Sequence, residues 1–142
     1  MTTSAVRVRP AALHPLHALL LAGSLPLFIG GLLTDLAYYN SYHIQWSNFA
    51  SWLIAGALVV SGLALLCALI GLCRSDRRQG TGLIYFLVLL GGWILGFINA
   101  LIHAKDAWAI MPTALVLSVI VTLLMLVATW LGFFSMRSGG VQ

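Results

Sequence analysis

The sequence has very few charged side chains. Of its 142 residues, seven are Lys or Arg and three are Asp or Glu, so that only 7% are charged. Soluble domains carry about 25% charged residues, and a soluble fold with so few would lack the polar surface to cover itself. Hydrophobic residues make up 61% of the chain. We therefore expect a membrane protein with a single domain over residues 1–142.

Cysteines and the motifs of soluble enzymes are also scarce. The two cysteines, Cys67 and Cys73, lie near the end of one apolar segment, at a spacing that turns their side chains in different directions on a helix. The sequence has no glycine-rich phosphate-binding loop, no Cys/His spacing typical of zinc sites and no nucleophile beside a partner base. These absences favour a protein that is not an enzyme, and we assign no catalytic residue.

The chain does contain long apolar segments, each able to cross a bilayer as a helix, which takes roughly 20 such residues. They cover approximately residues 14–36, 48–73, 82–104 and 111–135. The connections between them are short, so consecutive segments should run antiparallel. The sequence thus predicts an all-α polytopic membrane protein, a four-helix antiparallel transmembrane bundle.

The basic residues are distributed unevenly around these segments. With both termini on the same side, that side collects Arg7, Arg9, Arg74, Arg77, Arg78 and Arg137. The opposite side holds only Lys105. Cytoplasmic loops are enriched in Lys and Arg, which predicts a multi-pass protein of the cytoplasmic (inner) membrane with both termini inside. The net charge of +4 therefore reflects topology, and we expect no nucleic-acid partner.

Polar residues follow one face of the first segment. Steps of four and three residues give a stripe of His14, His17, Leu21, Ser24, Phe28, Gly31 and Asp35. An ionisable side chain in hydrocarbon is costly, so this face should turn toward other helices.

The third and fourth segments each have a face of the same kind. The third carries Gly92, Gly96, Asn99 and His103, and Gly92-x-x-x-Gly96 is typical of close helix packing. The fourth carries Ser118, Thr122, Met125, Thr129 and Gly132, which we interpret as an inward face without assigned chemistry.

Depth in the membrane divides the polar residues into two groups. His14 and Asp35 are separated by about 31 Å along a helix with a rise of 1.5 Å per residue. His14 and His17 should therefore lie at the cytoplasmic interface, as anchors or as a helix cap. A candidate cluster on the outer side comprises Asp35, Asn99, His103, Asp106 and His43. For Asp35 with His103, two interpretations stay open: a structural hydrogen-bonded pair, or a ligand-binding or proton-handling site.

Three stretches resemble the domain-of-unknown-function 2231 family of predicted bacterial inner-membrane proteins. They are His14-Pro15-Leu16-His17 with Pro26 and Asp35, then Asn99-x-x-x-His103-x-x-Asp106-x-Trp108, then Pro112 to Ser118 with Trp130-Leu131-Gly132. The resemblance covers residues 14–141. It implies a four-helix protein of the bacterial inner membrane and brings no established activity.

Three functions are consistent with these features. The first is a small anchor or assembly partner of a membrane or periplasmic enzyme, including a redox enzyme. The second is a membrane electron carrier that binds haem b or a quinone, with His103 as the best candidate haem ligand. The third is a proton- or ion-conducting element. The expected partners are the lipid bilayer and another membrane or periplasmic protein, with a homo-oligomer as an alternative.

The predicted orientation can be tested by thiol labelling of single cysteines introduced into the loops. In a Cys67→Ser, Cys73→Ser background, a cysteine at Gly80 should react only after the membrane is permeabilised, because the arginine-rich side is cytoplasmic. A cysteine at Ala104 should react in intact cells with a reagent that does not cross the membrane. The reverse labelling pattern would contradict the orientation.

Overall fold

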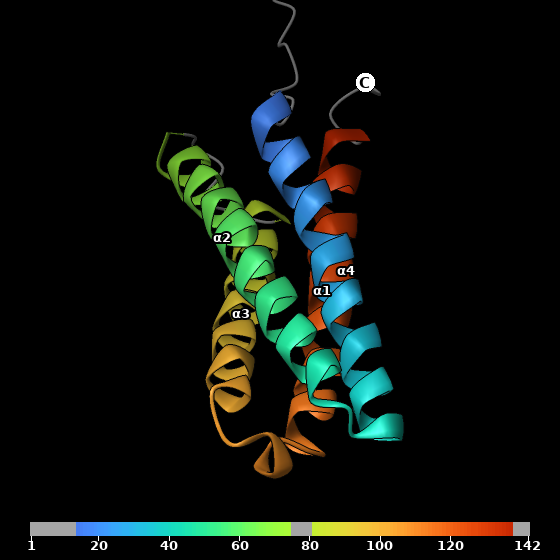
Figure 1. Ribbon diagram of the computed structural model, residues 1–142. Helices are drawn as coiled ribbons and strands as arrows, with labels where there is room; N and C mark the ends of the chain where they lie inside the picture. The colour runs from blue at the N-terminus through green and yellow to red at the C-terminus, as the bar shows by residue number, and fades with distance from the viewer. Residues whose placement is uncertain (1–13, 75–80, 138–142) are drawn as a thin grey trace, which may run out of the picture.

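Four helices make up almost all of the structure. The computed structural model describes residues 14–74 and 81–137, and within them no strand is present. The helices are α1 (Pro15–Ser41), α2 (Ile44–Arg74), α3 (Thr81–His103) and α4 (Thr113–Arg137), with a short 3₁₀ turn, η1 (Ala107–Ala109), between α3 and α4 (Figure 1). All four are long and apolar enough to cross a membrane. The predicted all-α, four-helix membrane fold is confirmed.

The helices extend beyond the apolar segments at the α1–α2 connection. The first apolar segment was expected to end near residue 36 and the second to begin near residue 48, but only Tyr42 and His43 separate the two helices. Tyr42 ends α1 in the left-handed conformation, and its N–H donates to the carbonyl of Tyr38 at 2.7 Å. The aromatic residues Tyr38, Tyr39 and Trp46 therefore lie within the helices, and aromatic side chains suit the membrane interface in a helix as well as in a loop.

Each helix has two neighbours in the bundle. α1 packs against α2 and α4, and α3 packs against the same two helices. α1 and α3 therefore face each other diagonally, and they run in the same direction because each is antiparallel to α2. α1 begins and α4 ends at the same end of the bundle, while the α1–α2 turn and η1 lie at the other end (Figure 1).

The buried residues of α1 and α3 follow the same pattern. On α1 they are His17, Leu21, Ser24, Phe28, Gly31, Asp35 and Tyr38, and on α3 they are Tyr85, Leu89, Gly92, Gly96, Asn99 and His103. Both stripes alternate steps of four and three, which is the repeat of helices packed at a small crossing angle. The stripe predicted for the first segment is therefore buried, apart from His14, which is exposed.

The outer surface is apolar, as contact with lipid requires. Trp52 is 80% exposed, and Leu19 and Trp130 are each 70% exposed. The centre of the bundle is apolar too, with Leu21, Leu89 and Met125 fully buried in one cluster. Polar side chains that are buried lie where helices meet, because lipid offers them no hydrogen-bond partner.

Small residues allow the helices to approach closely. A Cβ atom added to Gly92 would lie 3.0 Å from the sulfur of Met125, and one added to Gly96 would lie 3.3 Å from the ring of Phe28. At Gly132 a Cβ atom would lie 2.6 Å from Cδ2 of Leu21. By contrast, a Cβ atom on Gly91 meets nothing within 4 Å.

These contacts predict opposite outcomes for one chemical change. Gly132→Ala should lower the free energy of unfolding by about 1–3 kcal/mol, because Leu21 is fully buried and the added methyl group overpacks the core. Gly91→Ala should leave stability unchanged or raise it by up to about 1 kcal/mol, because alanine favours the helix. Denaturant unfolding in detergent micelles measures both. Equal destabilisation of the two variants would refute the packing described here.

Candidate functional site

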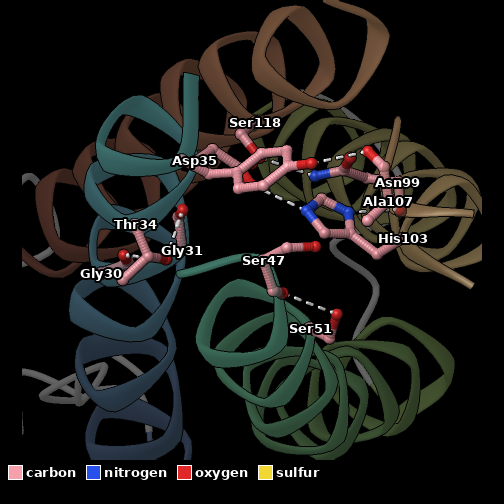
Figure 2. A network of polar contacts seen from close by, with 11 residues as sticks. Gly30, Gly31, Thr34, Asp35, Ser47, Ser51, Asn99, His103, Ala107 and Ser118 are labelled. Carbon is pink, nitrogen blue, oxygen red and sulfur yellow. Dashed lines mark hydrogen bonds and ion pairs between the residues drawn. The ribbon is translucent and has the colours of Figure 1, made fainter. Parts of the chain in front are cut away.

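Four polar side chains from three helices meet inside the bundle. Nε2 of His103 lies 2.7 Å from Oδ1 of Asp35, and Asn99 Nδ2 donates to Ser118 Oγ at 2.8 Å. The Ser118 hydroxyl donates to the second oxygen of Asp35. We call Asp35, Asn99, His103 and Ser118 the polar cluster. Figure 2 shows these side chains grouped between α1, α3 and α4.

Helix position explains why these side chains meet. Asp35 lies six residues before the end of α1, His103 is the last residue of α3, and Ser118 lies five residues after the start of α4. At 1.5 Å per residue all of them lie within about 10 Å of the same end of the bundle. The Asp35–His103 contact crosses the diagonal between α1 and α3, each of which packs mainly against α2 and α4.

The hydrogen-bond partners show where the protons lie. A carbonyl oxygen can only accept, so Nδ1 of His103 carries the proton that it donates to the Asn99 carbonyl at 2.9 Å. The contact between Nε2 and Asp35 then needs one proton, held by either atom. The pair is an imidazolium with a carboxylate or an imidazole with a carboxylic acid, and both forms have zero net charge. A neutral pair suits an interior of low dielectric constant.

One acceptor of the polar cluster has no partner. Ser118 donates its only hydroxyl hydrogen to Asp35, so it accepts a hydrogen bond from the Asn99 amide group, which turns Nδ2 of Asn99 toward it. Oδ1 of Asn99 points away, is buried, and has no hydrogen bond within the described residues. Buried polar atoms without a partner are uncommon in native proteins.

Tyr38 closes the polar cluster on the side of η1. Its hydroxyl donates to the carbonyl of Ala107 at 2.9 Å, and its ring packs with Ile110 and Ala114. On the α2 side of the cluster, Figure 2 shows Ser47, which is also buried. The carboxylate of Asp35 is completely shielded as a result, with 0% side-chain exposure.

A second polar pair joins α1 and α3 at the other end of the bundle. Nε2 of His17 lies 2.7 Å from the hydroxyl of Tyr85, and both residues are buried. His14 is exposed at the start of α1, where its Nδ1 accepts a hydrogen bond from the Leu16 N–H. His17 and His103 are too far apart to bind the same iron, because α1 places Asp35, the partner of His103, about 27 Å from His17.

The structure brings together some of the predicted site residues and leaves others apart. Asp35, Asn99 and His103 belong to one hydrogen-bonded group, whereas His43 and Asp106 are exposed and take no part in the hydrogen bonds described for the cluster. Depth alone grouped His43 and Asp106 with the others, and depth does not set the direction in which a side chain points. Sequence reasoning had placed Ser118 on an inward face without giving it a partner, and it did not single out Tyr38 or Tyr85.

The geometry offers little to a metal or a haem. Among residues 14–74 and 81–137, no three His, Cys, Asp or Glu side chains come together as a metal site would require. Both ring nitrogens of His103 already have partners, so ligation of a haem iron by this residue would first break its bond to Asp35 or to the Asn99 carbonyl. Axial haem ligation needs a free ring nitrogen.

The fold and the polar cluster define a class: a four-helix membrane protein whose two ends are each joined by a polar pair across the α1–α3 diagonal. The chain belongs to the DUF2231 family of predicted membrane proteins, whose model matches residues 13–141. The resemblance seen in the sequence is thereby confirmed. No curated protein and no solved structure matches the chain.

A double-mutant cycle tests the strength of the Asp35–His103 contact. His103→Leu should lower the free energy of unfolding by about 3–5 kcal/mol, because it leaves a buried carboxylate without its partner. Asp35→Leu should do the same to the imidazole. The double variant should lose less than the sum of the two, because no unpaired ionisable group remains.

Unfolding of the variants in the same micelles provides the measurement. Ser24→Ala is the matched control, because Ser24 is equally buried on the α1 stripe but bonds only to the Leu21 carbonyl of its own helix. This variant should change stability by less than about 1 kcal/mol. Strict additivity of the two leucine substitutions would show that the side chains do not interact.

Proposed function

We propose that this membrane protein binds and releases a proton at the Asp35–His103 pair and thereby changes the packing of its helices. The observation that supports the proposal is the buried contact of 2.7 Å between His103 Nε2 and Asp35 Oδ1, which requires one proton between the two atoms. Ionisable residues inside a membrane protein are functional candidates by default, since their burial is costly.

The electrostatics of the pair link proton exchange to packing. Removing the shared proton leaves a net negative charge in the cluster, and adding another leaves a net positive charge. Either charge is expensive in a dry interior. The structure can lower this cost by admitting water, and we infer that water enters past Tyr38 and η1, which cover the cluster at its end of the bundle. Proton exchange should therefore loosen the bond between Tyr38 and Ala107.

Other ionisable groups at this end are more exposed than the pair. His43, Lys105 and Asp106 are exposed, and the buried polar residues Ser47 of α2 and Ser118 of α4 carry hydroxyl groups without an ionisable charge. Tyr39 and Tyr42 are exposed as well, whereas Tyr38 is buried and its hydroxyl donates a hydrogen bond to the carbonyl of Ala107. The protonation of the cluster thus depends mainly on Asp35 and His103.

The anchor or assembly role is the second proposal. It is supported by the outer surface, where large aromatic side chains such as Trp52, Phe49 and Trp130 are exposed, and aromatic residues are enriched at protein interfaces as well as at membrane interfaces. The two roles are compatible, because a bundle that changes its packing with protonation can transmit that change to a neighbour. Placement in the inner membrane with both termini inside also remains a proposal, supported by the arginine distribution.

The proton-binding proposal predicts pH-dependent opening of the α3–α4 connection. In nanodiscs, hydrogen–deuterium exchange at Lys105, Ala109 and Ile110, corrected for the intrinsic pH dependence of amide exchange, should be slowest at intermediate pH. It should accelerate toward both acid and alkali as the pair gains or loses a proton. In Asp35→Asn/His103→Gln this minimum should disappear.

His43→Gln is the matched control, because it removes an exposed imidazole at the same end and should retain the minimum. If the double variant is poorly folded, Asp35→Asn alone provides the comparison, since it keeps an amide that can bond both His103 and Ser118. A corrected exchange profile that is identical in the wild-type protein and in Asp35→Asn would contradict the proposal.

A further inference from the structure

We infer that Oδ1 of Asn99 is the binding site of a buried water molecule. The atom is inaccessible to solvent and has no hydrogen-bond partner in the part of the chain described here, and the residue as a whole is 1% exposed. Burial of an acceptor without a donor costs about 1–3 kcal/mol. Buried waters typically satisfy such atoms.

The orientation of the Asn99 amide makes this site specific for a donor. Its Nδ2 is held by Ser118 Oγ at 2.8 Å, and that hydroxyl is held in turn by Asp35. Rotating the amide by half a turn would bring Oδ1 against Ser118 Oγ. Neither oxygen could then donate a hydrogen bond to the other, because the Ser118 hydroxyl already donates to Asp35. Oδ1 is therefore fixed in a direction where it can only accept.

The charge of the polar cluster favours water over a cation. Asp35 and His103 form a neutral pair together, so a bound sodium or ammonium ion would add an uncompensated charge to the interior. A neutral donor adds none. Water is also the donor small enough to reach a residue that side chains from α1, α3 and α4 surround.

The water reaches this site from the end of the bundle where η1 lies. Toward the other end, the path is blocked by the apolar core, in which Leu21, Leu89 and Met125 are fully buried and Phe28 packs against Gly96. This step alone rests on the proposed function. Because water enters from one end, Asp35 and His103 exchange their proton with only one side of the membrane. The site exchanges its proton with the compartment beside Lys105 and does not conduct across the bundle.

Water-edited solid-state NMR of asparagine-labelled protein in bilayers tests the site. The chain has three asparagines, of which Asn40 and Asn48 are exposed and Asn99 is buried. Magnetisation from water should reach the side-chain amide of Asn99 about as fast as it reaches the side-chain amide of Asn48. It should reach the backbone amide of Leu89, in the dry centre of α3, several-fold more slowly. The side-chain amide signal that is missing from the spectrum of Asn99→Leu is the signal of Asn99.

A build-up at Asn99 as slow as that at Leu89 would overturn the water site. The proton-exchange proposal can fail separately. If the Asn99 signal builds up fast but amide exchange in the α3–α4 connection has no minimum with pH, the water site stands and the proton-exchange proposal is contradicted. To test one-sidedness, proteoliposomes with a single orientation receive a pH jump on one side at a time. A response of the α3–α4 connection to a jump on the side of Arg74 alone would contradict one-sided access.

Discussion

The cost of an unpaired charge in a lipid-solvated bundle is the constraint on which the rest of this structure depends. Of the two acidic residues in the part of the chain that the structure describes, Asp106 is exposed and Asp35 is fully buried, between a histidine and a serine from two other helices. A carboxylate in this place would be prohibitive without a neutralising partner. The shared proton with His103 supplies that neutrality, and to form the contact α1 and α3 must approach across the diagonal of the bundle.

The same diagonal recurs at the other end with different chemistry. His17 and Tyr85 are separated in sequence by 68 residues, and so are Asp35 and His103. The two buried stripes therefore run in register along the whole bundle, with polar pairs at both ends and apolar or small residues between them. Such an arrangement stabilises both ends while keeping the centre free of a continuous polar path. We consider it better suited to local proton binding than to conduction.

Much of this arrangement could be predicted from the sequence. Scarcity of charge and four apolar segments were sufficient for the fold, and the spacing of residues from His17 to Asp35 identified the face that is buried. Helical periodicity likewise placed Asn99 and His103 on one face. These predictions succeed because they depend only on the geometry of a single helix and on the cost of exposing polar groups to lipid.

The remaining features depend on how helices are rotated and shifted relative to one another. The sequence pattern put Ser118 on an inward face, yet its bond to Asp35 follows from the packing of α4 against α1. Tyr85 is the partner of His17 only because α3 is in register with α1, a regularity that the matched four-three spacing of the two stripes could have indicated. His43 and Asp106 share the depth of the cluster but lie in connections that direct them outward.

The most direct test of the central claim is a solid-state NMR measurement, in bilayers, of the contact between the His103 ring nitrogens and the carboxyl carbon of Asp35. Our account predicts a protonated Nδ1 and close contact of Nε2 with that carbon, whereas an unprotonated Nδ1, or no contact between the two side chains, would contradict it.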